Sequence, residues 1–132
     1  MDAAKYSPLY LKGIEYFNEC EFFEAHEVWE DLWSEDQSSS RTFYQGLIQA
    51  AVALHHFGNG NTRGARKLYH SSSRYLAEFR PRHMGLDVER FLGEMTTCFA
   101  DVIGSDEEVP KVDVSAELIP EIILDSSSAD ST

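Results

Sequence analysis

Three residues of the sequence combine side-chain types and a spacing that suit metal binding. His26, Glu30 and Trp33 form the pattern His-x-x-x-Glu-x-x-Trp within residues 21–33. On a helix of about 100° per residue, His26 and Glu30 stand one turn apart on one side. Imidazole nitrogens and carboxylate oxygens bind divalent cations, so the pair predicts two ligands of one ion. The pattern differs from the zinc-protease His-Glu-x-x-His, because Glu30 replaces the second histidine.

The helix that carries this pair is expected to bury it. On a helical wheel, His26 and Glu30 fall within the arc occupied by the aromatic residues Phe22, Phe23, Trp29 and Trp33. A carboxylate among aromatic side chains is costly unless it is paired. We therefore expect Glu30 to have polar partners, with His26 one turn away as the first of them.

The next predicted helix offers further polar partners. Gln45, Gln49 and His56 fall within about 40° of one another on an otherwise apolar helix. In one interpretation, these three residues join His26 and Glu30 in a closed hydrogen-bond network that fixes the packing of two helices. In the other, His26 and Glu30 bind a divalent metal ion of unknown identity. Glu27, His56 or Gln49 completes the ligand set, and His56 is the third ligand that we predict. Glu27 then acts as general base on metal-bound water, and the site is lined by Gln45, Gln49, Trp29 and Trp33.

Helical periodicity recurs along the chain, and strand signals are nearly absent before residue 109. Helices are expected at residues 8–18, 21–33, 41–57, 61–79 and 86–103. A weak repeat at an offset of 40 is similar to a tetratricopeptide helical hairpin, and it pairs Phe17 with Phe57, Ala25 with Ala65 and Trp29 with Tyr69. The prediction is an all-α fold: a compact array of about five helices, built from two tetratricopeptide-like hairpins plus a C-terminal helix and an extended arm.

The end of the chain differs from the rest. Residues 109–124 hold Pro110 and Pro120 among Val, Ile and Leu, which indicates an extended arm over the helices with a short helical turn near residues 115–118. Residues 1–124 are expected to form one domain. Residues 125–132 are polar, and we expect a disordered tail there.

The charge distribution narrows the choice of partners. The 132 residues carry a formal net charge of −12, which argues against general nucleic-acid binding. The charge is uneven, with −8 in residues 1–40, +5 in residues 41–90 and −9 in residues 91–132. The central cations either pair with the acidic flanks or form an anion-binding surface; they include Arg63, Arg66, Lys67, Arg74, Arg80 and Arg82.

Cysteine content and hydropathy suggest where the protein works. Cys20 and Cys98 are its two cysteines, too few for a disulfide framework. Neither a secretory signal nor an apolar membrane span is apparent. We therefore expect a cytoplasmic protein that does not enter a membrane. A protein partner or a homodimer is compatible with these features.

The motif and its neighbours resemble a known family. His26-x-x-x-Glu30-x-x-Trp33 is similar to the signature of the domain of unknown function 309 family. Residues 43–50, His56 and residues 60–61 resemble its second block, and residues 85–88 resemble its third, so that the resemblance spans residues 7–124.

This resemblance implies a small bacterial or archaeal all-helical protein. It also implies a His–Glu motif suspected of metal binding, without an established activity or substrate. The function expected is therefore divalent-metal binding, with metal-dependent hydrolysis as its extension. The alternative is a non-enzymatic, tetratricopeptide-like interaction module in which the His, Glu and Gln residues form a structural network.

Overall fold

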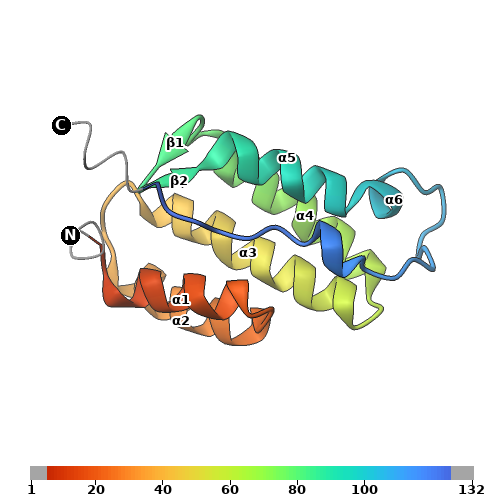
Figure 1. Ribbon diagram of the computed structural model, residues 1–132, viewed down its shortest axis with the longest axis horizontal. Helices are drawn as coiled ribbons and strands as arrows, with labels where there is room; N and C mark the ends of the chain where they lie inside the picture. Colours follow the sequence, from red (N-terminus) through yellow and green to blue (C-terminus); the bar gives the residue numbers. More distant parts are fainter. Residues whose placement is uncertain (1–5, 126–132) are drawn as a thin grey trace.

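The computed structural model describes residues 6–125 and consists mainly of α-helices (Figure 1). A two-stranded antiparallel hairpin precedes the fifth helix. The predicted all-α class is confirmed. The elements in chain order are α1 (Pro8–Asn18), α2 (Phe22–Glu35), α3 (Arg41–Gly58), α4 (Thr62–Ala77), β1 (Arg82–His83), β2 (Leu86–Asp87), α5 (Val88–Cys98), α6 (Ala100–Ile103) and the 3-10 turn η2 (Ala116–Leu118).

The first four helices form two hairpins whose turns have matching geometry. Cys20 in the first turn and Gly60 in the second both have a positive φ, 61° and 81°. The backbone N–H groups of Glu21 and Asn61 each donate to the carbonyl five residues earlier, at 2.9 and 2.8 Å. These bonds and the left-handed residue are typical of a Schellman helix end. The repeat at an offset of 40 therefore extends to the backbone of the turns.

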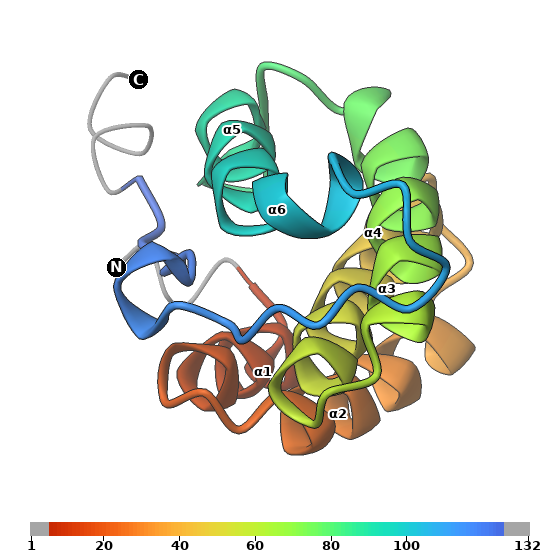
Figure 2. The same ribbon diagram turned by 90° about the vertical axis from the view of Figure 1, so that its right-hand side faces the viewer.

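The helices pack around one apolar core. Viewed along the helices, α1 to α5 follow an arc, and the C-terminal arm runs along its open side (Figure 2). α2 and α3 lie side by side, as do α3 and α4. The repeat-related residues are all buried, namely Phe17, Phe57, Ala25, Ala65, Trp29 and Tyr69. The small side chains of Ala25 and Ala65 let the helices of each pair approach closely.

The region predicted as one helix at residues 86–103 is divided. Met84 and Gly85 turn the hairpin with positive φ values of 50° and 78°, which is typical of a two-residue hairpin turn. The side chain of Asp87 caps α5 by accepting from the backbone N–H of Arg90 at 3.0 Å. α5 ends at the buried Phe99, and α6 follows directly. Gly85 was the signal for the hairpin, and the apolar periodicity of residues 86–103 obscured it.

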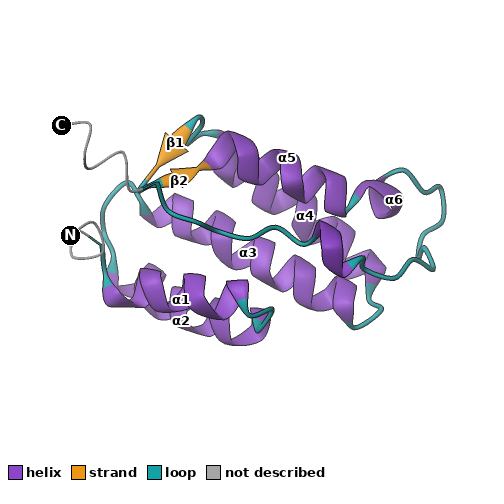
Figure 3. Cartoon of the chain, in the orientation of Figure 1, coloured by secondary structure: helices purple, strands orange, loops and turns teal. Residues whose placement is uncertain are grey.

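The predicted arm and its short turn are confirmed. Beyond α6 the chain passes between α1 and α5 (Figure 3), interrupted by η2. Asn18 fastens the arm, because its side-chain amide donates to and accepts from the backbone of Ile122 at 2.8 Å in both directions. Asp125 is also held, since its N–H donates to the carbonyl of Gly85 at 2.6 Å. The rest of the predicted tail, residues 126–132, lies outside the described residues.

None of the helices formed by residues 6–125 is long and apolar enough to cross a membrane.

Candidate functional site

The motif lies along the edge of α2 that faces α3. These helices are antiparallel, so the end of α2 meets the beginning of α3. Arg41 lies over the ring of Trp33, and the ring of Phe23 lies 5.6 Å from that of His55. The opposite edge of α2 faces α1 and the core, through Phe22, Ala25, Trp29 and Leu32.

His26 is oriented by its own helix. Its Nδ1 lies 2.7 Å from the carbonyl oxygen of Phe23. A carbonyl oxygen only accepts, so the hydrogen bond places a proton on Nδ1. The lone pair of the neutral ring is then on Nε2, 3.9 Å from Oε2 of Glu30. The ring of Phe23 packs edge-on against the imidazole, and 18% of the His26 side chain is exposed.

Glu30 is not buried among aromatic residues, contrary to the prediction. Its side chain is 59% exposed, so water solvates the carboxylate and no buried partner is required. The helical wheel treated every aromatic residue as core-facing, but Phe23 is itself 47% exposed. The aromatic arc therefore covers one buried edge and one solvated edge of α2, and Glu30 belongs to the second.

The two tryptophans of α2 have different roles. Trp29 is completely buried, and its indole N–H donates to the carbonyl of Tyr10 on α1 at 3.2 Å. The prediction that Trp29 lines the site is therefore wrong, because Trp29 anchors α2 in the core. Trp33 is half-buried, and the Arg41 guanidinium stacks on its ring at 3.9 Å and donates to its carbonyl at 3.0 Å. Nothing in the motif's spacing pointed to Arg41.

A shallow hollow of about 330 Å³ lies beside Glu30, between α2 and α3. Of the predicted lining residues, Trp33 and Gln45 contribute to it, whereas Gln49 does not. Residues missed by the sequence interpretation complete its walls, namely Asp31, Ser34 and Ile48. Asp31 is exposed, so this wall of the hollow is open to water.

The predicted hydrogen-bond network is wrong. Within residues 6–125, no hydrogen bond joins His26 or Glu30 to Gln45, Gln49 or His56. The Oε1 atom of Gln49 is buried and has no partner there. Gln45 lines the hollow beside Glu30, but Gln49 does not line it and His56 contacts Asn61, so the three polar residues of α3 do not form one network with the motif.

The structure separates the adjacent histidines of α3. His55 faces α2, as its contact with Phe23 shows. His56 faces the turn into α4, where the side-chain amide of Asn61 donates to its Nδ1 at 3.3 Å. Burial lowers the pKa of His56, and the neighbouring His55 lowers it further. His56 therefore belongs to the α3–α4 turn in this structure and is not brought to the His26–Glu30 pair.

A complete set of metal ligands is not assembled. No group of three or more His, Cys, Asp or Glu side chains suited to one ion occurs within residues 6–125. His26 and Glu30 form a pair without a third protein ligand. Glu27, the predicted general base, is exposed and lies about 100° around the helix from His26. Its catalytic role stays a prediction.

Most cations of the central segment are already occupied. Arg66 donates to the carbonyls of Val102 and Glu107 at 2.9 to 3.2 Å, and it thereby joins α4 to α6. Lys67 and Arg74 are exposed and form no ion pair within residues 6–125. The other predicted anion-binding residues pair with carboxylates, in the ion pairs Arg63–Glu108, Arg80–Glu89, Arg82–Asp87 and Arg82–Asp125. The acidic flanks therefore neutralise much of the basic segment.

Comparison with known proteins identifies the region that carries the motif. Residues 10–68 match the model of the family described as domain of unknown function DUF309. This part of the chain is similar to that family, and we call it the DUF309 region. The predicted resemblance is therefore confirmed from α1 to the middle of α4. Its third block, residues 85–88, lies beyond the matched residues.

Two relatives of the DUF309 region are uncharacterised bacterial proteins. The chain is 38% identical over 92 residues to YpuF of Bacillus subtilis (strain 168), a stretch that covers 67% of this chain and 53% of YpuF. It is 30% identical over 99 residues to a protein of Aquifex aeolicus (strain VF5), a stretch that covers 74% of this chain and 28% of that protein. The chain thus spans about half or less of these relatives. Neither relative's name states an activity.

Proposed function

We propose that the DUF309 region binds a divalent metal ion at the solvated edge of α2, with His26 and Glu30 as its protein ligands. The observation that carries this proposal is the orientation of His26. The Phe23 carbonyl holds the proton on Nδ1, and Nε2 therefore faces the Glu30 carboxylate at 3.9 Å. Histidines that bind metals commonly donate their second ring N–H to a carbonyl in this way.

The separation of the two side chains supports the same proposal. Two ligands about 2.1 Å from one tetrahedral ion are about 3.4 Å apart. The 3.9 Å between Nε2 and Oε2 is wider by about 0.5 Å, and Glu30 is exposed enough to move by that amount. Both atoms are hydrogen-bond acceptors when the imidazole is neutral. A cation between them would satisfy both.

The surrounding charge also favours a cation. Glu27 and Asp31 flank Glu30 on α2, and both are exposed. Within residues 6–125 the site offers two protein ligands, so water would fill the remaining positions of the ion. Open positions are typical of catalytic zinc sites, whereas structural zinc sites are closed by four protein ligands. We therefore expect weak, exchangeable binding.

Metal titration of the tag-free chain tests this proposal. Isothermal titration with Zn²⁺ and with Mn²⁺ is carried out on the parent, His26→Ala and Glu30→Gln. We expect one site in the parent and a loss of affinity of more than about tenfold in each variant. Glu24→Gln is the matched control, since Glu24 is an exposed carboxylate on the far face of the same helix. Equal affinities in all four proteins would refute the proposal.

Two finer predictions are tested in the same titration. His56→Ala should leave the affinity unchanged, because His56 contacts the α3–α4 turn. A large loss would make His56 the third ligand after all. For the hydrolytic extension, Glu27→Gln should abolish any zinc-dependent cleavage of chromogenic esters while leaving zinc affinity intact. If the parent cleaves none of them, this extension has no support.

A second candidate function is protein interaction without catalysis. It is favoured by a hollow on another face of the molecule, which exposes apolar side chains beside carboxylates. The cytoplasmic location expected from the sequence stays a prediction.

A further inference from the structure

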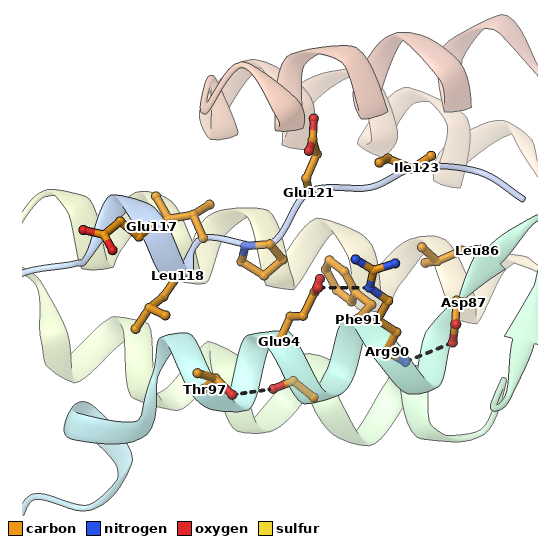
Figure 4. Close-up of a pocket in the computed structure, with 13 residues that line it drawn as sticks. Leu86, Asp87, Arg90, Phe91, Glu94, Thr97, Glu117, Leu118, Glu121 and Ile123 are labelled. Carbon is orange, nitrogen blue, oxygen red and sulfur yellow. Dashed lines mark hydrogen bonds and ion pairs between the residues drawn. The ribbon is translucent and has the colours of Figure 1, made fainter.

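A larger hollow, of about 480 Å³, lies between α5 and the C-terminal arm (Figure 4). We call it the α5–arm groove. It is separate from the motif, because no residue of α2 or α3 lines it. Its walls include Arg90, Gly93, Glu94 and Thr97 from α5, and Leu118 and Glu121 from the arm.

Gly93 leaves open space in the wall of this groove. A Cβ atom built at Gly93 meets nothing within 4 Å. Two large apolar side chains remain uncovered at the rim, since Leu118 is 42% exposed and Ile123 is 71% exposed. Figure 4 shows them toward opposite ends of the groove. Exposed apolar side chains that line a hollow and have polar neighbours are typical of interaction sites.

The charged residues that line the groove indicate the charge of its partner. Its lining holds four carboxylates and one guanidinium. Arg90 is already paired with Glu94 at 3.1 Å. Asp87 is paired with Arg82 at 3.6 Å. The two carboxylates of the arm, Glu117 and Glu121, are exposed and form no ion pair within residues 6–125. A cationic partner is therefore favoured.

We propose that the α5–arm groove binds a segment of another protein in which lysine or arginine flanks an apolar side chain. The apolar side chain packs above Gly93 and against Leu118, and the cations pair with Glu117 and Glu121. The partner is a peptide segment, because a ligand that covers both Leu118 and Ile123 must extend along α5. This proposal develops the second candidate function and is independent of metal binding at α2.

The test uses the full chain and two synthetic peptides. Both have about twelve residues and the same leucine spacing; one carries lysine and the other glutamate at the polar positions. Amide chemical shifts of ¹⁵N-labelled protein report where each peptide binds. We expect the lysine peptide to shift the signals of Gly93, Thr97, Leu118 and Ile123, and the glutamate peptide to leave them unchanged. Added salt should weaken binding.

Two variants locate the binding site. Gly93→Leu places a side chain in the open space and should lower the affinity for the lysine peptide by more than about tenfold. The double variant Glu117→Lys, Glu121→Lys should lower this affinity to a similar extent, and both side chains are exposed, so the core packing is not changed. Its matched control is Glu24→Lys, Glu35→Lys, which reverses two exposed carboxylates of α2 and should bind like the parent.

Three results would overturn the proposal. One is the absence of shifts at the groove with the lysine peptide. Another is binding that Gly93→Leu leaves unchanged. The third is a set of groove signals that move with protein concentration alone, since this would assign the groove to a second copy of the chain. The metal titration of His26→Ala is unaffected by any of these results, so the two proposals fail separately.

Discussion

Replacing Gly13 by alanine should destabilise the protein severely, because this glycine lets α1 contact the indole of Trp29. A Cβ atom at position 13 would overlap the Nε1, Cδ1 and Cε2 atoms of that ring. The ring is fully buried, and its N–H donates to Tyr10 at 3.2 Å. The indole has no room to withdraw, so α1 must move away from α2.

The magnitude follows from two effects. Overpacking a core costs about 1–3 kcal/mol and occasionally more, and loss of the Trp29–Tyr10 hydrogen bond adds about 1 kcal/mol. The higher helix propensity of alanine offsets about 1 kcal/mol of this cost. With overpacking at the upper end of its range, we expect Gly13→Ala to lower the free energy of unfolding by about 3 kcal/mol. For a chain of this size the melting temperature should fall by about 10 °C. Urea and thermal denaturation followed by far-UV circular dichroism measure both quantities.

Gly93→Ala is the matched control for this substitution. It is the same chemical change within a helix, but the new Cβ atom meets nothing within 4 Å. Alanine favours a helix over glycine by about 1 kcal/mol, so Gly93→Ala should raise the free energy of unfolding. If Gly13→Ala is as stable as the parent, the close approach of α1 to Trp29 is not present in solution.

Three further predictions concern the turn at Cys20, the half-buried His83 and the basic segment. Cys20→Gly should stabilise the protein by about 1 kcal/mol in urea denaturation, because Cys20 has a φ of 61° and glycine adopts this conformation without strain; an unchanged midpoint would contradict this. Burial lowers the pKa of His83, so the unfolded chain takes up a proton first, and the free energy of unfolding should fall as the pH drops below the ordinary histidine pKa of about 6.5. This pH dependence should be smaller in His83→Gln, and an equal slope would show that other groups cause it. Arg66→Met removes hydrogen bonds to two carbonyl groups and should lower the free energy of unfolding by about 2 kcal/mol. Lys67 is its exposed neighbour, and Lys67→Met should change the free energy of unfolding by less than about 0.5 kcal/mol. Equal effects of the two substitutions would show that Arg66 does not stabilise the contact between α4 and α6.

The helical hairpins were predictable because their signals are local. Ser7 accepts from the N–H of Leu9 at 3.1 Å, and Pro8 fills the first helical position, as the sequence indicated. α1 therefore begins and ends at the predicted residues. The division of residues 86–103 was missed because apolar periodicity continues through Phe99, and periodicity alone does not reveal where a helix ends.

The candidate site was predicted only in part, for a different physical reason. The spacing of His26 and Glu30 correctly placed them beside each other. Their burial was inferred from the aromatic residues around them, but an aromatic side chain such as Phe23 can lie on a solvated edge. The contribution of Gln45 could be predicted from the packing of α2 against α3, whereas that of Arg41 depends on how the ends of these two helices meet.

The motif is best explained as two potential ligands and one residue that fixes their surroundings. Trp29 holds α2 to α1 through the core, and Trp33 holds the end of α2 to α3 through Arg41. Glu30 lies between these two tryptophans, so its backbone is fixed while its carboxylate remains in water. His26 is fixed by the carbonyl of Phe23. A rigid backbone beneath exposed side chains favours binding of an exchangeable ligand, because little order must be gained when the ligand arrives.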